Sequence, residues 1–259
     1  MQSLSITSAA NPRFRAAVRL RQGRVRRREG RFLVDGRREI SRAIAAGYEL
    51  LELYVTTDSP SAESLGAIPQ LWIELPPSML DQLAYGDRNE GAVAVFAARH
   101  RTLDQLRLPE NPLLVVLDRV EKPGNIGAVF RSADAAGASA VLLSDCAGDL
   151  FNPNLIRASL GTAFTTPAAQ ATAAEVRHWL HARGVRMLAT RVDAPATLWE
   201  TDWRAPAAIV IGSEAEGLGP EWAGEGISGV RIPMAGVADS LNASVTAALC
   251  LFEATRQRN

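Results

Sequence analysis

The chain has 259 residues, a length that suits two domains better than one. Its composition is 47% hydrophobic and 22% charged, which excludes a chain that is disordered throughout. The formal net charge at pH 7 is zero, so the totals alone do not point to a nucleic-acid partner.

The N-terminus and the cysteines indicate where such a protein works. The opening stretch MQSLSITSAANPRFR has no apolar signal core, and no apolar run reaches the roughly 18 residues that span a bilayer. Cys146 and Cys250 are far apart and predict neither a disulfide framework nor a CxxC metal site. We therefore expect a reduced, cytoplasmic protein with no membrane association and no bound metal.

The first part of the chain alternates helix and strand signals. Helices are predicted over 11–22 and 37–47 and from Pro76, and strands over 50–56, 71–75 and 91–97. These elements predict a small α/β domain over residues 1–98. The polar, proline-containing segment that follows predicts a linker over 99–111.

From Leu113 the alternation restarts and continues to the C-terminus. Strands are predicted over 113–118, 139–145, 185–190, 207–213 and 229–234, and helices after the glycine loop at 124–127 and over 152–161, 173–184 and 239–258. Strands that alternate with helices predict a mostly parallel sheet covered on both faces. This domain is expected over residues 112–259.

Three predicted strands of this domain end in loops that mix glycine with polar residues. The loops read DRVEKPGNIGAVFR from 118, IGSEAEGLGPE from 211 and IPMAGVADSLNAS from 232. Ligands bind beyond the carboxyl ends of the strands in an open parallel sheet, and glycine allows the backbone to approach them closely. The three loops are therefore expected to form one pocket.

A dinucleotide-binding enzyme is the first alternative for such a pocket. Its fingerprint is G-x-G-x-x-G with an acidic residue about 20 positions later. Asp145 suits the acidic position, but Gly124 and Gly127 provide only GxxG. A P-loop is excluded, because no glycine-lysine-hydroxyl triplet occurs in the chain.

The three loops together resemble the signature motifs of the SpoU–TrmH family of RNA ribose methyltransferases, in the SPOUT superfamily. The resemblance rests on PGNIGAVFRSADAAGASAVLL, IGSEAEGLG and IPMAGVADSLNASVTAALCLFEATRQR, which occur in the family's order from Leu113 onward. The segment FLVDGRREISRAIAAG also resembles the substrate-binding domain that many members carry first.

This resemblance implies a fold, a reaction and partners. The implied fold is α/β, with a C-terminal parallel-sheet SPOUT domain that contains a trefoil knot, preceded by the small α/β substrate-binding domain. The implied reaction is methylation of a ribose 2′-hydroxyl in structured RNA with S-adenosylmethionine, in a homodimer. The two-domain layout favours ribosomal RNA over transfer RNA. A non-catalytic RNA-binding protein of the same fold stays open as a different class.

The resemblance also implies the site residues. The polar catalytic set is Asn125, Arg131, Glu214, Ser240 and Asn242. The residues expected to contact the cofactor are Thr190, Ile211, Gly212, Ile232, Met234 and Leu241. Structural roles are the alternatives: Asn125 could cap its helix, and Asp239 or Ser240 could cap the last helix. Glu214 and Glu216 could be a solvated loop pair, and Arg131 could be a surface residue of its helix.

The segment 13–38 is rich in arginine, and Glu29 and Asp35 are its only acidic residues. Such a concentration favours contacts with RNA phosphates, although a charge run can also be a solvated helix face. The candidates for RNA contact are Arg13, Arg15, Arg24, Arg26, Arg27 and Arg28.

Overall fold

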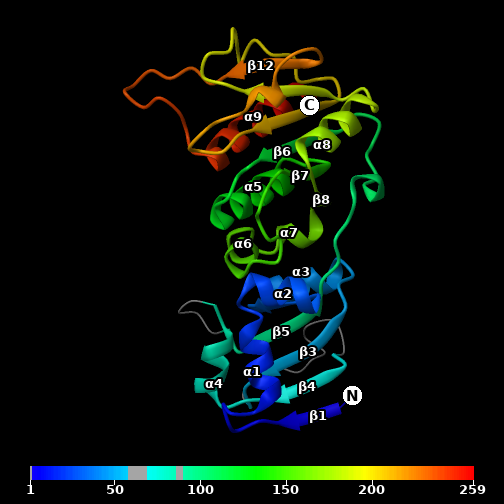
Figure 1. Ribbon diagram of the computed structural model, residues 1–259, viewed down its shortest axis with the longest axis vertical. Coiled ribbons are helices and arrows are strands. Elements are labelled where there is room, and N and C mark those ends of the chain that lie inside the picture. Colours follow the sequence, from blue (N-terminus) through cyan, green and yellow to red (C-terminus); the bar gives the residue numbers. More distant parts are fainter. Residues whose placement is uncertain (1, 58–68, 86–89) are drawn as a thin grey trace. The chain divides into compact units, whose positions relative to one another are not determined.

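The computed structural model describes residues 2–57, 69–85 and 90–259, which form two compact units (Figure 1). The first unit contains the described residues up to Arg99 together with Asp149–Thr165. The second contains His100–Gly148 and Thr166–Asn259. Within the described residues, no helix is long and apolar enough to cross a membrane.

The first unit is built on a five-stranded sheet of order β1-β4-β3-β5-β2. The strands are β1 (Gln2–Ser5), β2 (Arg31–Asp35), β3 (Leu50–Val55), β4 (Leu71–Glu74) and β5 (Ala92–Ala97). β4 pairs in parallel with β1 and β3, whereas β5 pairs antiparallel with β3 and β2. The three predicted strands are confirmed, and β1 and β2 are additional.

Helices cover both faces of this sheet. The helices from the N-terminal segment are α1 (Pro12–Arg19), α2 (Gly23–Glu29), α3 (Arg37–Ala45) and α4 (Pro77–Leu83). Alternate residues of β5 point to opposite faces, so Val93 and Val95 join the core beneath α1 and α4, while Ala94 and Phe96 join the core beneath α3. The helix predicted over 11–22 is therefore two helices, since α1 ends at Arg19 and α2 begins at Gly23.

A segment from the second half of the chain completes this unit. Helices α6 (Pro153–Ala158) and α7 (Thr162–Thr165) bring Phe151, Ile156 and Phe164 into the core beneath α3. The ring of Phe32 stacks on that of Phe151 with the centroids 4.3 Å apart. The sequence interpretation assigned this segment to the domain 112–259; in the structure its aromatic residues fill the core of the first unit.

The second unit is a seven-stranded sheet of order β10-β12-β9-β11-β6-β7-β8 in which every pairing is parallel. Its strands are β6 (Leu113–Asp118), β7 (Ala140–Ser144), β8 (Ala168–Ala171), β9 (Arg186–Thr190), β10 (Ala196–Thr197), β11 (Ala207–Ile211) and β12 (Ile227–Arg231). The predicted parallel sheet is confirmed, with β8 and β10 added at its edges.

Helices lie on both faces of the second sheet. α8 (Ala173–His181) packs Val176, Trp179 and Leu180 against the apolar side chains of β6 and β7. α5 (Pro123–Ala135) packs against α9 (Ala243–Arg258), which also contacts β11. The predicted linker carries the short 3-10 helix η2 (Leu103–Gln105), and Leu106 beside it is buried in the same core as α8.

Candidate functional site

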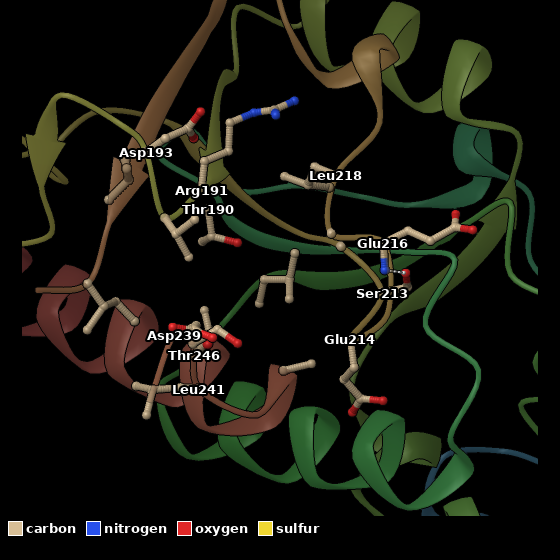
Figure 2. Close-up of a pocket in the computed structure, with 18 of the residues that line it drawn as sticks. Thr190, Arg191, Asp193, Ser213, Glu214, Glu216, Leu218, Asp239, Leu241 and Thr246 are labelled. Atoms are coloured by element: carbon tan, nitrogen blue, oxygen red, sulfur yellow. Dashed lines mark hydrogen bonds between the residues drawn. The ribbon is translucent and has the colours of Figure 1, made fainter. Parts of the chain in front are cut away.

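A cavity of about 400 Å³ lies among the loops that follow β9, β11 and β12 (Figure 2). This volume is in the range of small-molecule sites. All six residues expected to contact the cofactor line the cavity, namely Thr190, Ile211, Gly212, Ile232, Met234 and Leu241. Ser240, from the polar catalytic set, lines it as well.

Gly212 is required by the tight loop that follows β11. A Cβ atom at this position would lie 2.2 Å from the carbonyl carbon of Gly217, so no side chain fits. The Gly217 amide donates a hydrogen bond of 2.9 Å to the carbonyl of Ser213, and Gly217 has a φ of +65°. The loop thus folds back on itself at one wall of the cavity.

Glu214 joins all three signature loops. Its carboxylate accepts a hydrogen bond from the side-chain amide of Asn125 in the first loop. It also accepts one of 3.4 Å from Asn242 in the third loop, and its Oε2 pairs with Nζ of Lys122 at 2.9 Å. The side chain of Glu214 is 27% exposed although the residue as a whole is exposed, so its link to the other two loops rests on these contacts.

The observed N-caps of α5 and α9 are not the residues that the alternative interpretations named. α5 begins at Pro123 after Lys122, so Asn125 lies inside the first turn and is not the N-cap. Asn242 caps α9, because its Oδ1 accepts from the Ser244 amide at 2.9 Å; neither Asp239 nor Ser240 is the N-cap. Asn242 thus both starts the last helix and contacts Glu214.

Arg131 is the member of the catalytic set that contacts neither the cavity nor the other polar residues of the set. It lies on the exposed side of α5, and within the described residues it makes no hydrogen bond or ion pair. The loop contacts therefore unite Asn125, Glu214 and Asn242, place Ser240 at the cavity, and leave the Arg131 guanidinium available.

The acidic residue of the dinucleotide alternative has a structural partner. A carboxylate oxygen of Asp145 accepts a hydrogen bond of 3.2 Å from the amide of Ala173, the first residue of α8. Burial raises the pKa of the neighbouring Cys146 thiol to about 11, so this cysteine is protonated near neutral pH. Both cysteines are free and buried.

Two basic residues near the loops were missed from the sequence. Lys122 was overlooked because a lone lysine before a proline carries no motif. Arg191 lines the cavity, and its guanidinium donates to the backbone carbonyls of Gly219 at 3.0 Å and Trp222 at 3.3 Å. Only the folded chain reveals the second loop as its partner.

Carboxylates outnumber cations around the cavity. Asp193, Glu214, Glu216 and Asp239 line it, and Arg191 is the one basic residue among its lining residues. Figure 2 shows Asp193 and Asp239 on one side of the opening and Glu214 and Glu216 on the other. Glu214 is already paired with Lys122, so Asp193 and Asp239 are the carboxylates best placed to favour a ligand that carries positive charge.

Residues 112–252 match the family model described as the SpoU rRNA Methylase family. The chain therefore belongs to the SpoU family. Residues 11–94 match a second model, the MRM3-like substrate binding domain.

Relatives in the SpoU family match nearly the whole chain. The 23S rRNA (uridine(2479)-2'-O)-methyltransferase of Streptomyces viridochromogenes is 34% identical over 97% of this chain and 92% of its own length. A crystal structure described as RNA 2'-O ribose methyltransferase is 41% identical, with a TM-score of 0.86, and the match covers 98% of this chain and 99% of that one. The AdoMet-bound rRNA methyltransferase of Sinorhizobium meliloti is 31% identical, with a TM-score of 0.90 over 99% of this chain and 98% of that one.

Proposed function

We propose that the chain is an S-adenosylmethionine-dependent methyltransferase that modifies a ribose 2′-hydroxyl of ribosomal RNA. The observation that carries the proposal is Glu214, which gathers Lys122, Asn125 and Asn242 beside a cavity lined by the expected cofactor residues. Among the relatives that match both units, the Streptomyces viridochromogenes enzyme is named for 2'-O-methylation of 23S rRNA, which supports ribosomal RNA as the substrate. One of the two crystal structures is named for RNA 2'-O ribose methylation and the other as an rRNA methyltransferase.

The cavity fits S-adenosylmethionine in shape and in charge. Ile211, Ile232 and Leu241 offer apolar walls suited to an adenine ring. The surrounding carboxylates suit a molecule with a sulfonium cation. When bound, this cofactor supplies an electrophilic methyl group on a positively charged sulfur.

The polar set then acts on the RNA. A ribose hydroxyl reacts well only when it is positioned and its proton is shared or removed. Glu214 holds the amides of Asn125 and Asn242, so these three residues fix the shape of the site. Arg131 is permanently charged, and we assign it to gripping an RNA phosphate and stabilising charge on the ribose oxygen.

The path of the C-terminal segment supports a trefoil knot in residues 112–259. The chain runs from β11 past β9 to β12, and then returns so that α9 packs against β11 and α5. A trefoil knot additionally requires that this segment pass through a loop of the chain, and we include the knot in the proposal because the family resemblance implies it.

A second copy of the chain is proposed to cover an apolar patch on α9. The patch consists of Val245, Leu249 and Phe252 on one face of α9, with Trp199 beside them. Trp199 is 58% exposed and Phe252 is 52% exposed. Contiguous exposed apolar residues of this size are typical of interaction sites, so we propose a homodimer.

Phe252→Asp is expected to convert this dimer to monomers, because a carboxylate placed at the centre of an apolar interface loses its hydration. The measurement is the molar mass by light scattering over a range of protein concentrations. Leu4→Asp is the control, since Leu4 is 41% exposed but lies on β1. A monomeric parent protein, or a Phe252→Asp variant that stays dimeric, would contradict the proposed interface.

The arginines of the first unit separate into exposed and structural residues. Arg15, Arg24, Arg27 and Arg28 are exposed, and Arg13 pairs with Glu52 at 2.5 Å. Arg26 must be removed from the proposed RNA contacts, because its side chain is 4% exposed and pairs with Asp149 at 2.7 Å. The other five arginines stay in the proposal.

Replacing Arg24, Arg27 and Arg28 by Ala together is expected to weaken RNA binding and flatten its salt dependence. Each lost phosphate contact reduces the slope of log affinity against log salt by about 0.7 to 0.9. Binding of an rRNA fragment across a salt series measures the slope. An unchanged slope would show that these arginines are only a solvated face.

The proposed function is tested by a transfer assay with labelled S-adenosylmethionine and total RNA from cells that lack this gene. Label is expected in a 2′-O-methylnucleoside from the ribosomal RNA fraction. Label in small RNA would favour transfer RNA, and cofactor binding without transfer to any RNA would favour a non-catalytic binding protein. A ribosomal substrate also supports a cytoplasmic location.

A further inference from the structure

Arg119, the first residue after β6, has an unusual backbone conformation. Its φ is +52°, in the left-handed region that residues other than glycine adopt at a cost of about 1–2 kcal/mol. The Arg119 amide donates a hydrogen bond of 2.9 Å to the carbonyl of Ser144, at the end of the neighbouring strand β7. Such strain persists where the surrounding structure enforces it, and it often marks a functional position.

The guanidinium of Arg119 is anchored on one side by a buried carboxylate. Its Nε lies 3.0 Å from Oδ2 of Asp118, whose side chain is fully buried. The Ser144 hydroxyl donates to the other oxygen of Asp118 at 2.8 Å. The end of β6 thus holds the base of the arginine in a fixed place.

On its other side the guanidinium reaches the second signature loop. Its Nη2 lies 3.1 Å from a carboxylate oxygen of Glu221, and its Nη1 lies 3.8 Å from one of Glu216. Glu216 lines the cavity with Gly217 and Leu218, and Glu221 belongs to the short 3-10 helix η3 (Pro220–Trp222), whose Trp222 is fully buried. Arg119 therefore links the end of β6 to a carboxylate of the cavity wall and to a carboxylate of η3.

The left-handed backbone of Arg119 and its contacts with three carboxylates indicate a structural role for this residue at the cavity. We propose that Arg119 is a positioning residue that holds loop 213–222 in its ligand-ready shape, so that S-adenosylmethionine binds a preformed cavity. The inference rests on the proposed function, because it takes that cofactor as the ligand. A loop ordered before binding loses less conformational freedom when the ligand arrives, which raises affinity.

Two single variants test the inference from opposite sides of the contact. Arg119→Gly removes the guanidinium and relaxes the left-handed backbone, whereas Glu221→Ala removes a loop partner and leaves the Arg119–Asp118 pair intact. Each is expected to weaken S-adenosylmethionine binding about two- to fivefold, as measured by titration calorimetry. The double variant is expected to lose little more than either single one, since both remove the same link.

Hydrogen exchange of the chain without cofactor gives a readout that does not depend on activity. The Gly217 amide bonds to Ser213 and the Trp222 amide bonds to Gly219, so both report on the loop. Faster exchange of these two amides, with unchanged exchange in β6 and β7, is the expected result. Glu225→Ala is the control, because Glu225 is exposed in the same part of the chain and forms no ion pair among the described residues.

The outcomes separate this inference from the proposed function. Parental affinity in Arg119→Gly, or weaker binding without faster exchange of the loop amides, would overturn the role of Arg119. If the parent protein fails to bind S-adenosylmethionine, the proposed function fails. The exchange measurement then still decides whether Arg119 holds the loop.

Discussion

Arg131→Ala is expected to lower the rate of methyl transfer by at least about 100-fold, a loss typical of removing a group that stabilises developing charge. Arg131 lies on the exposed side of α5 and has no partner among the described residues, so the substitution leaves no buried charge behind. Since Arg131 does not line the cavity, S-adenosylmethionine should bind with nearly parental affinity. Single-turnover transfer to rRNA and calorimetric titration of the cofactor measure the two quantities separately.

Two further variants make this prediction specific. Arg131→Lys keeps the charge but loses the planar, two-point contact with phosphate, and we expect it to recover only a small part of the rate. Arg107→Ala is the matched control, because Arg107 is also an exposed arginine of the second unit. Full turnover in Arg131→Ala, or an equal loss in Arg107→Ala, would remove Arg131 from the site.

The sequence predicted the second unit better than the first. Buried parallel strands such as LLVVL and AAIVI are continuous apolar runs, and the glycine loops behind them are recognisable without a structure. β1 has the sequence QSLS and β2 has RFLVD next to the arginine run, so neither shows a strong apolar pattern. Their places depend on pairing with β4 and β5, which local sequence does not specify.

The candidate site shows a similar division. The three loops and their polar residues were predictable, because a resemblance identifies motifs that are continuous in the chain. The partners within the site were not, since Glu214 meets Asn125 across 89 positions and Asn242 across 28. Lys122 and Arg119 carry no motif of their own and acquire their roles only through carboxylates on the second loop.

Arg26 is the clearest case in which composition was misleading. Its neighbours Arg24, Arg27 and Arg28 are exposed, but its own guanidinium contacts a carboxylate 123 positions away. This difference in burial between Arg26 and its neighbours follows from helix geometry, because only one face of α2 points to the core. The arginines of one run can therefore have different roles, and their burial distinguishes the structural arginines from those that are free to contact RNA.

Asp149→Asn is expected to destabilise the first unit by about 3–5 kcal/mol, the usual cost of leaving one member of a buried ion pair without its partner. Asp149 binds Nε and Nη2 of Arg26 at 2.8 and 2.7 Å, and its side chain is 12% exposed. In the parent protein the Phe151 amide donates a hydrogen bond of 2.9 Å to Oδ1 of Asp149. An asparagine keeps a side-chain oxygen that can accept this hydrogen bond. The lost stability therefore comes from the charge of the pair.

Native-state hydrogen exchange in β2 and β5 under increasing urea measures the free energy of unfolding of this unit, apart from the second unit. Arg27→Ala is the control, since Arg27 is exposed on the same helix and should change this free energy by less than about 0.5 kcal/mol. Combining Asp149→Asn with Arg26→Met should recover part of the loss, because the methionine leaves no unpaired charge, although the carbonyls of Leu20 and Arg21 lose the donor that Arg26 provides. Equal stability in Asp149→Asn and the parent protein would mean that Arg26 is solvated after all, and it would then return to the arginines proposed to contact RNA.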